Sequence, residues 1–272
     1  VRLAESLGFA AVWLRDVPFD VQTFGDAGLT FDPFVYLGLL AGATDQIGLG
    51  VASVILPLRH PAHVAKAAAS ADVLSGGRLL LGVASGDRPD EFPAMGVPHA
   101  ERGARFRAAF EYVERMAETA PGFDNPYGSP TSGMNMLPKP VGGRIPLLVT
   151  GGSQQPPEWL ASHGDAWMTY PRPTLGMQSA VVADFRARVA AVGRGPRPVM
   201  QPLYVDLADD PTAAPTPIHL GLRLGVDRLV EHLTGLRSIG INHVAINLRF
   251  NTSPTEQAMR RLAERVLPAL DP

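Results

Sequence analysis

Seven short apolar segments recur along the chain, and a segment with helical periodicity follows each of them. Most of the seven are continuously apolar rather than alternating, as in strands that are covered on both faces. They are 10–16, 47–56, 78–86, 145–152, 166–171, 198–207 and 243–250. Right-handed crossover connections turn such an alternation into a parallel sheet. The sequence therefore predicts an α/β fold.

The segments between these strands carry the boundary residues of helices. Asp32 before Pro33 is typical of an N-cap followed by a first-turn proline, and Pro61 is a typical first residue of the next helix. The apolar stripe of a surface helix is clearest in 99–120. The other predicted helices are 33–44, 61–74, 174–193, 225–240 and 255–270.

An initial helix followed by seven strands predicts a (β/α)8 TIM barrel whose first strand is missing from this sequence. Because a barrel with one strand missing would expose two edges of a buried sheet, we expect a short strand before Val1. An open Rossmann-type sheet would need a glycine fingerprint and an acidic residue about 20 positions further on, and neither is found. A length of 272 residues suits one barrel domain, 1–272.

Three segments depart from the alternation, and we interpret them as excursions within this single domain. Residues 17–31 and 121–144 are rich enough in glycine and proline to close as lids. Residues 208–221 are similar in composition and connect a strand to a helix. No internal repeat is evident beyond the alternation itself.

The composition limits the chemistry and the partners. A net charge of −2 with a pI near 6.4 gives no basic field for nucleic acid or an anionic membrane. No run reaches the roughly 18 apolar residues of a membrane span. The absence of cysteine excludes disulfides, thiolate zinc sites and cysteine nucleophiles, and it favours a cytoplasmic location. His60 and His63 have only Asp72 as an acidic neighbour, so we predict no metal site.

Polar residues lie at the carboxyl ends of the predicted strands, where a parallel barrel binds ligands. They are Arg15, Asp16, Ser53, Ser85, Asp87, Arg88, Gly151, Gly152, Ser153, Tyr170, Arg172, Asp206, Asn247 and Arg249. The stretch GGSQQPPEW (151–159) offers backbone N–H groups and a hydroxyl to a phosphate. Alternatively, Ser153 only caps a turn. Arg88 has two readings as well, a phosphate partner or the partner of Asp90 or Glu91.

The segment 49–86, with its L-P, R-H-P, A-D-x-L-S-G-G-R and L-G-V-x-x-G elements, resembles the bacterial-luciferase-like monooxygenase superfamily. Residues 138–153 and 163–168 are similar to its fifth and sixth strands. Residues 15–38 and 242–250 look like an uncharacterised bacterial subgroup. This resemblance implies a (β/α)8 barrel that binds reduced FMN, or in one branch F420, at the carboxyl ends of its strands.

The resemblance also implies roles for particular residues. A cis peptide between Ala52 and Ser53 would lie beneath the flavin ring. The phosphate loop would be Gly151, Gly152, Ser153 and Gln154, and the segment Ser85, Gly86, Asp87 and Arg88 would flank the cofactor. Tyr170 and Arg172 would lie where substrate approaches.

From this we expect an FMNH2-dependent monooxygenase that acts on a small organic substrate with O2. A separate reductase would supply reduced flavin, because the chain has no NAD fingerprint. His60, Arg15 and Tyr170 are the candidates for an acid or polariser. The alternatives are an F420-dependent hydride-transfer oxidoreductase and a non-catalytic flavin-binding relative. The alanine-rich helix 62–74 and the resemblance favour a homodimer.

Overall fold

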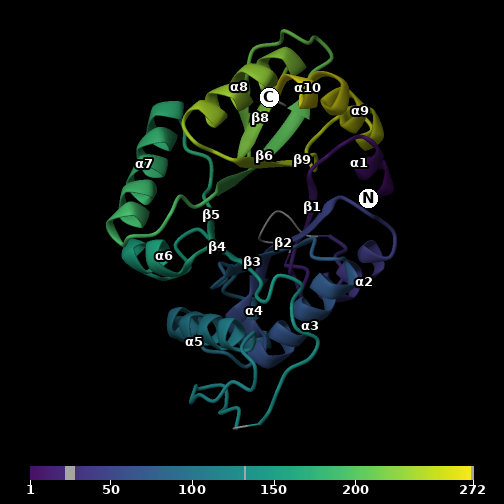
Figure 1. Cartoon of the computed structure of the whole chain (residues 1–272). Coiled ribbons are helices and arrows are strands. Elements are labelled where there is room, and N and C mark those ends of the chain that lie inside the picture. The colour runs from purple at the N-terminus through teal and green to yellow at the C-terminus, as the bar shows by residue number, and fades with distance from the viewer. Residues whose placement is uncertain (22–27, 132, 271–272) are drawn as a thin grey trace. The chain divides into compact units, whose positions relative to one another are not determined.

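The computed structural model describes residues 1–21, 28–131 and 133–270, which form two compact units (Figure 1). The first unit comprises Val1 and Trp13–Pro156, and the second comprises Arg2–Val12 and the chain from Pro157 onward. The boundary falls within strand β1 (Ala11–Leu14). Each unit has strands, covering helices and a buried apolar interior of its own.

The first unit is built on three parallel strands and the helices between them. In chain order it contains α2 (Pro33–Ala41), β2 (Gly48–Ile55), the 3-10 turn η2 (Leu56–Leu58), α3 (Pro61–Leu74), β3 (Leu79–Ala84), α4 (Glu91–Ala94), the 3-10 turn η3 (His99–Glu101), α5 (Arg102–Arg115) and β4 (Leu147–Thr150). Strand β3 lies between β2 and β4 and pairs in parallel with both. Helix α3 packs against α2 and α5 (Figure 1). The carboxyl ends of β2, β3 and β4 therefore share one edge of the sheet.

Local chemistry explains where these helices begin. The Asp32 carboxylate accepts hydrogen bonds from the backbone N–H groups of Phe34 and Val35, at 3.0 and 3.2 Å, which caps α2. The N-cap of α3 is His60, whose Nδ1 accepts from Ala62 N at 3.3 Å. Pro33 and Pro61 occupy first-turn positions, where a missing N–H costs nothing. Both predicted helix starts are confirmed.

A shift in strand register sets the shape of the β2–β3 pair. The pairing moves between Val51 and Val54, and the Ala52–Ser53 peptide bond between them is cis. Opposite this irregularity lies Gly82 of β3, where a Cβ would overlap the carbonyl oxygen of Val51. Only glycine lets the two backbones approach this closely. The sequence element L-G-V thus has a structural reason at its glycine.

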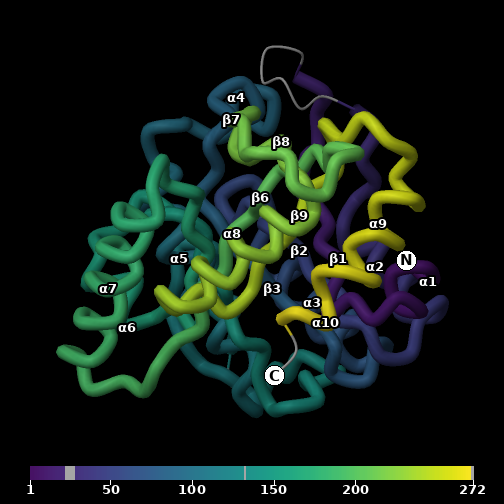
Figure 2. The backbone as a smooth tube through the Cα atoms, turned by 90° about the horizontal axis from the view of Figure 1, so that it is seen from above, coloured from purple at the N-terminus to yellow at the C-terminus, as the bar shows by residue number. Residues whose placement is uncertain are grey.

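The second unit is centred on one long strand, β6 (Val199–Leu207). Its other elements are α1 (Arg2–Ser6), α6 (Pro157–His163), β5 (Ala166–Met168), α7 (Leu175–Ala191), β7 (Thr216–Ile218), β8 (Gly221–Leu224), α8 (Val226–Ser238), β9 (His243–Asn247), α9 (Thr255–Arg265) and α10 (Leu267–Leu270). Strand β6 pairs in parallel with β5, β8 and β9, whereas β7 and β8 form an antiparallel hairpin. Helix α6 packs on α7, and α8 on α9 and α10 (Figure 2).

The core of the second unit is built around one face of β6. Val199, Leu203 and Val205 are at most 2% exposed and belong to the same buried apolar cluster as Phe185 of α7 and Leu229 of α8. Burial of such side chains contributes about 1.5–3 kcal/mol each. The remaining buried members of the cluster are Ala161, Val182, Val189, Leu207, Leu224, Val226, Leu233, Leu236, Ile241, Ala258, Leu262 and Val266.

The predicted α/β fold with its mostly parallel sheet is confirmed, and all seven predicted strands form within their expected ranges. Closure of the sheet into a barrel and a strand before Val1 stay predictions. The segment 208–221, interpreted as an irregular excursion, contains β7 and the first residue of β8. Of the predicted lid 17–31, residues 22–27 lie outside the described residues. Within the described ranges, no helix is long and apolar enough to cross a membrane.

Candidate functional site

Two hydroxyl groups bridge strands β2 and β4 of the first unit. Ser53, at the register shift of β2, forms a short hydrogen bond with Thr150, the last residue of β4. Both residues are buried. Strand β3 runs between β2 and β4, and a Cβ at its Gly82 would lie 3.2 Å from Ser53 Oγ. The bridge therefore depends on the absence of a side chain at position 82.

The loop after β4 has an unusual backbone. Gly151, Ser153 and Gln154 have positive φ angles of 56°, 44° and 57°, a region that non-glycine residues rarely adopt. The buried Ser153 hydroxyl donates to the carbonyl of Thr150 at 2.7 Å. From the sequence, two roles were open for Ser153: capping a turn or binding a phosphate. The structure shows that its hydroxyl stabilises the turn, and phosphate binding by this loop stays a prediction.

Helix α5 holds this loop in place through Gln155. The Gln155 side-chain amide donates to the carbonyl of Gly103 at 2.8 Å. Its oxygen accepts from two nitrogens of Arg107, at 2.9 and 2.8 Å. These contacts join residues 48 and 52 positions apart. Gly103, Arg107 and Gln155 could not be predicted from the sequence, because no local pattern links a helix to a loop so far along the chain.

A second anchored group lies where β1 ends. The buried Asp16 carboxylate accepts from the Arg59 guanidinium at 2.9 and 2.6 Å and from the N–H of Ile55 at 3.1 Å. Arg59 also contacts Asp32 at 2.7 Å. Burial would lower the pKa of Arg59, but its hydrogen bonds to Asp16 and Asp32 and their charges outweigh this and raise it. Arg59 is therefore a permanent cation that ties β1, β2 and α2 together.

Arg88 and Glu91 follow β3 and are both buried, with exposed fractions of 5% and 2%. Their closest approach is 3.9 Å, between Arg88 Nη1 and Glu91 Oε1, which is an ion pair but too long for a hydrogen bond. Burial raises the pKa of Glu91 to about 7, although Arg88 acts in the opposite direction. Of the two roles left open for Arg88, the structure shows the contact with Glu91, and the phosphate role stays a prediction.

The three candidate acid–base residues differ in their surroundings. His60 Nδ1 caps α3, and its Nε2 lies 3.2 Å from the carbonyl oxygen of Tyr127. Arg15 follows β1 in the first unit and is one of the charges that act on Glu91. Tyr170 follows β5 in the second unit and is 37% exposed. Both ring nitrogens of His60 thus have structural partners, whereas Tyr170 is accessible.

The polar strand-end residues of the second unit are held by their own loops. The buried Asp206 accepts from Thr252 N and Oγ1, at 2.9 and 3.0 Å, and pairs with Arg223. Burial would raise the pKa of Asp206, but these partners lower it. Asn247 accepts from the N–H of Arg249 at 2.9 Å. Asp206 and Asn247 therefore stabilise the local fold, a role that was not predicted from the sequence.

Aromatic side chains gather beside Asp206, around Tyr204 of β6. The ring centroid of Tyr204 lies 5.9 Å from that of His219 and 5.1 Å from that of Phe250. His219 sits in the turn of the β7–β8 hairpin, so this hairpin brings a ring to the end of β6. This cluster could not be predicted from the sequence, because no local pattern indicated the hairpin.

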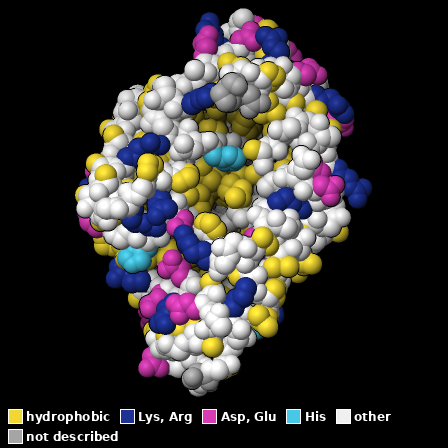
Figure 3. Space-filling model, viewed as in Figure 1, with side chains coloured by type: hydrophobic (Ala, Val, Ile, Leu, Met, Phe, Trp, Pro, Cys, Tyr) yellow, Lys and Arg dark blue, Asp and Glu magenta, His cyan; other side chains and the backbone are white. Residues whose placement is uncertain are grey.

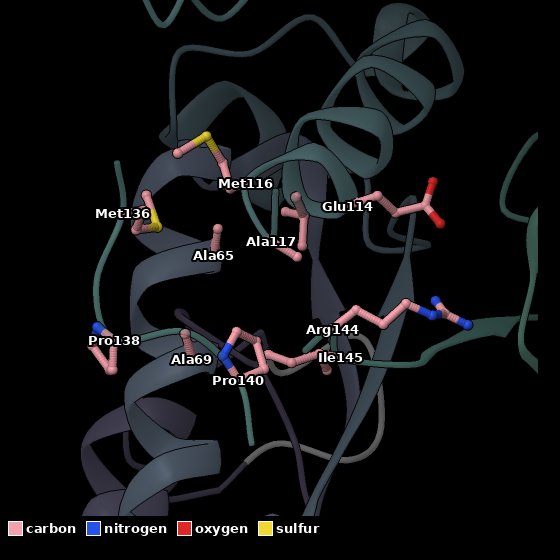
Figure 4. A pocket seen from close by; sticks show the side chains of 11 residues that line it. Ala65, Ala69, Glu114, Met116, Ala117, Met136, Pro138, Pro140, Arg144 and Ile145 are labelled. Carbon is pink, nitrogen blue, oxygen red and sulfur yellow. The ribbon is translucent and has the colours of Figure 1, made fainter. Parts of the chain in front are cut away.

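An apolar pocket lies on the helix layer of the first unit, between α3, α5 and the chain before β4 (Figure 4). Its lining includes Ala65, Ala69, Met116, Met136 and Pro138. Lys139, in the covering segment, donates to the carbonyl of Met116 at 3.1 Å. This end of the predicted lid 121–144 is therefore fastened to helix α5.

The visible face of the first unit carries acidic and basic side chains side by side, in the lower part of Figure 3. No field of one sign covers that face, in agreement with the net charge of −2. Within the ranges that the structure describes, no cluster of three His, Cys, Asp or Glu side chains could hold a metal ion.

The sequence matches the luciferase-like monooxygenase family over residues 1–267. The chain belongs to this family. An uncharacterised protein of Mycobacterium tuberculosis is 36% identical over 190 residues, 63% of this chain and 66% of the relative. The alkanal monooxygenase alpha chain of Photorhabdus luminescens is 28% identical over 165 residues, 60% of this chain and 44% of the relative. The matches thus span less than two thirds of the length of these two relatives.

Solved structures of luciferase-like fold are similar over nearly the whole chain. A monooxygenase from Streptomyces bottropensis has a TM-score of 0.84 at 22% identity, over 99% of this chain and 91% of that one. An F420-dependent secondary alcohol dehydrogenase reaches 0.81 at 18% identity, over 99% and 93%. The oxygenating constituent of 3,6-diketocamphane monooxygenase from Pseudomonas putida, solved with FMN, reaches 0.75 at 15% identity, over 98% and 90%.

One feature implied by the family resemblance can be compared with the structure directly. The resemblance implied a cis peptide between Ala52 and Ser53, and the structure has it. Thr150, the hydroxyl partner of Ser53, was absent from the sequence-based site because it was counted with the body of its strand. A polar residue at the last position of an otherwise apolar strand was the available signal.

Proposed function

We propose that this protein is a flavin-dependent oxidoreductase, an FMNH2-dependent monooxygenase that acts on a small organic substrate with O2. The observation that carries the proposal is the set of groups at one sheet edge of the first unit. These are the Ser53–Thr150 bridge, the loop 151–154 and the buried Arg88. Family membership supports the same reading. A separate reductase would supply the reduced flavin, and the cytoplasm would be the compartment.

The chemistry of these groups fits a phosphorylated flavin. A turn such as 151–154, in which residues of positive φ interrupt the ordinary backbone conformation, can present backbone N–H groups to an anion. An arginine suits phosphate by its planar fork of donors. In this proposal Gly151, Gly152, Ser153, Gln154 and Arg88 hold the phosphate. Ala52, Ser53, Ser85, Gly86 and Asp87 lie along the ring.

The bound flavin would supply the redox chemistry, and the chain would orient it and exclude water. Tyr170 is the proposed proton donor or polariser toward substrate, because its side chain is accessible and its position follows a strand end. Arg15 would contribute a fixed positive charge. His60 would act mainly by fixing the start of α3, since both of its ring nitrogens have partners.

The F420-dependent alternative draws support from the dehydrogenase of similar fold. The same fold accommodates FMN in the diketocamphane enzyme. FMN is the better proposal for this chain because Lys139, a basic residue in the loop before β4, already donates to backbone carbonyls of Met116 and Glu118. It is thus committed to the fold rather than offered to an acidic tail.

We also propose a homodimer through α2 and α3. Val35 and Leu39 of α2 are 76% and 66% exposed, and Leu74 at the end of α3 is 68% exposed. Contiguous exposed apolar patches mark interaction surfaces in soluble proteins. Light scattering of the wild type and of Leu39→Glu tests it, and a monomeric wild type would contradict it.

The function is tested by anaerobic titration of the protein with reduced FMN, followed by O2 and a substrate panel with an added flavin reductase. We expect saturable binding and substrate-dependent O2 consumption. Arg88→Gln should weaken binding at least about tenfold, whereas Arg115→Gln, at an exposed pair of the same spacing, should not. Binding without product would favour the non-catalytic relative. Reduction of F420 with indifference to O2 would favour hydride transfer, and no binding of either cofactor would refute the proposal.

A further inference from the structure

Glu91 is a carboxylate in an unusual position. It is 2% exposed, and its Oε1 has no hydrogen-bond partner among the residues that the structure describes. Its neighbour in sequence, Phe92, is fully buried and packs edge-on against His99 with ring centroids 4.8 Å apart. The segment is therefore fixed, and the carboxyl group has little freedom to turn toward water.

The charges around Glu91 do not balance it. Arg88, 3.9 Å away, and Arg15 stabilise the ionised form of Glu91. Asp16 and Asp87 destabilise it. Asp16 already accepts hydrogen bonds from Arg59 and the N–H of Ile55, so Glu91 cannot use it as a partner. A buried carboxylate without a close partner is costly, which favours the neutral acid.

We propose that Glu91 takes up a proton when the phosphate of FMN binds at Arg88, and so couples cofactor binding to pH. This inference rests on the proposed function. An ionised Glu91 would compete with the phosphate for Arg88 and repel it, whereas the neutral acid would do neither. The proton comes from solvent, and no covalent bond changes. Glu91 is thus a positioning residue that acts through Arg88.

Since Glu91 already titrates near neutrality in the free protein, the coupling falls in an accessible pH range. A phosphate dianion beside Arg88 would raise the pKa of Glu91 further. Below pH 7 the carboxyl is mostly neutral before binding, and little proton uptake is needed. Above pH 7 each binding event takes up about one proton, and the dissociation constant rises with pH.

The test is an FMN titration from pH 6 to 8.5 with the wild type and Glu91→Gln, which mimics the neutral acid. At pH 6 we expect the two dissociation constants to agree within about twofold. By pH 8.5 the wild type should bind about tenfold or more weakly than the variant. The second ionisation of the phosphate, near pH 6, affects both proteins alike. Riboflavin, which lacks the phosphate, should show no such divergence.

Calorimetry of the wild type in two buffers of different ionisation enthalpy gives a second, independent measurement that needs no variant. It should show uptake of close to one proton at pH 8. The matched control is Glu118→Gln, because Arg115 and Glu118 have the same i,i+3 spacing but are much less buried than Arg88 and Glu91. This control should follow the wild type at every pH.

Two results would overturn the inference and have different meanings. Parallel pH profiles for wild type and Glu91→Gln, without proton uptake, would leave Glu91 a structural residue while the proposed function stands. No FMN binding by the wild type at any pH would remove the proposed function and this inference with it.

Discussion

Two buried carboxylates, one in each unit, differ in how far the fold satisfies them. In the second unit, Asp206 is saturated by Thr252 and Arg223. In the first unit, Glu91 is just as buried but has an oxygen without a hydrogen bond and a pKa raised to about 7. A polar group at a strand end therefore indicates a ligand site only when its hydrogen-bonding capacity is not already consumed by the fold.

The largest expected change in stability, and the strongest test of this comparison, concerns two glycines, one in each unit. A Cβ at Gly82 would overlap the carbonyl oxygen of Val51, and a Cβ at Gly221 would overlap that of Tyr204. Gly82→Ala and Gly221→Ala should each lower the free energy of unfolding by about 3 kcal/mol. Only Gly82→Ala should also weaken FMN binding, at least about tenfold, because it displaces the Ser53–Thr150 bridge.

Thermal unfolding and flavin titration of the folded fraction separate the two outcomes. If Gly221→Ala lost as much flavin affinity as Gly82→Ala, the site would not be confined to groups of the first unit. A normal affinity in Gly82→Ala would show that the hydroxyl bridge is irrelevant to the cofactor.

A smaller effect is expected at Asp206, the saturated group. Asp206→Asn should cost about 1–3 kcal/mol at pH 7 without changing flavin affinity. Because the pKa of Asp206 is lowered in the folded state, its contribution is present above the usual value of 3.8 and is lost as pH falls through the folded value. The difference in Tm between wild type and variant should accordingly shrink below pH 4. A difference that stays constant down to pH 3 would contradict it.

The smallest effect is expected for the stability of Glu91→Gln. The folded-state pKa of Glu91 is raised from 4.5 to about 7, so its carboxyl stabilises the fold below pH 4.5 and loses this contribution as pH rises through 7. Relative to wild type, the Tm of Glu91→Gln should rise between pH 5 and 8, by roughly 2–6 °C. Glu118→Gln should show no such trend. A flat difference for Glu91→Gln would indicate an ordinary surface-like carboxylate.

The sequence predicted the parts of this fold that depend on local signals. Continuous apolar runs indicated the strands, and Asp32 with Pro33 marked the start of a helix. The β7–β8 hairpin escaped because it is short, and its Thr216 and Pro217 are exposed, so no apolar run or alternation announces it. A glycine at position 221 was the only local hint of strands in close approach.

For the candidate site the limit was distance along the chain. Residues 151–154 were recognisable from their glycines, but the partners of that region were not. Asp16 and Arg59 are 43 positions apart, and Ser53 and Thr150 are 97 apart. Pairings of this separation depend on which strands become neighbours, which local composition does not encode. The distinction between saturated Asp206 and unsaturated Glu91 required the same information.

The attachment of Gln155 to helix α5 has one more consequence. The loop 151–154 is ordered by contacts that exist without any ligand, so its conformational entropy is lost when the protein folds rather than when a cofactor arrives. A cofactor that meets this rigid cradle needs to match its shape but not to organise it. Arg107 lies on helix α5, 48 positions before Gln155. Without its side chain the loop would be ordered only when the cofactor binds, so substitutions at Arg107 should slow the capture of phosphate.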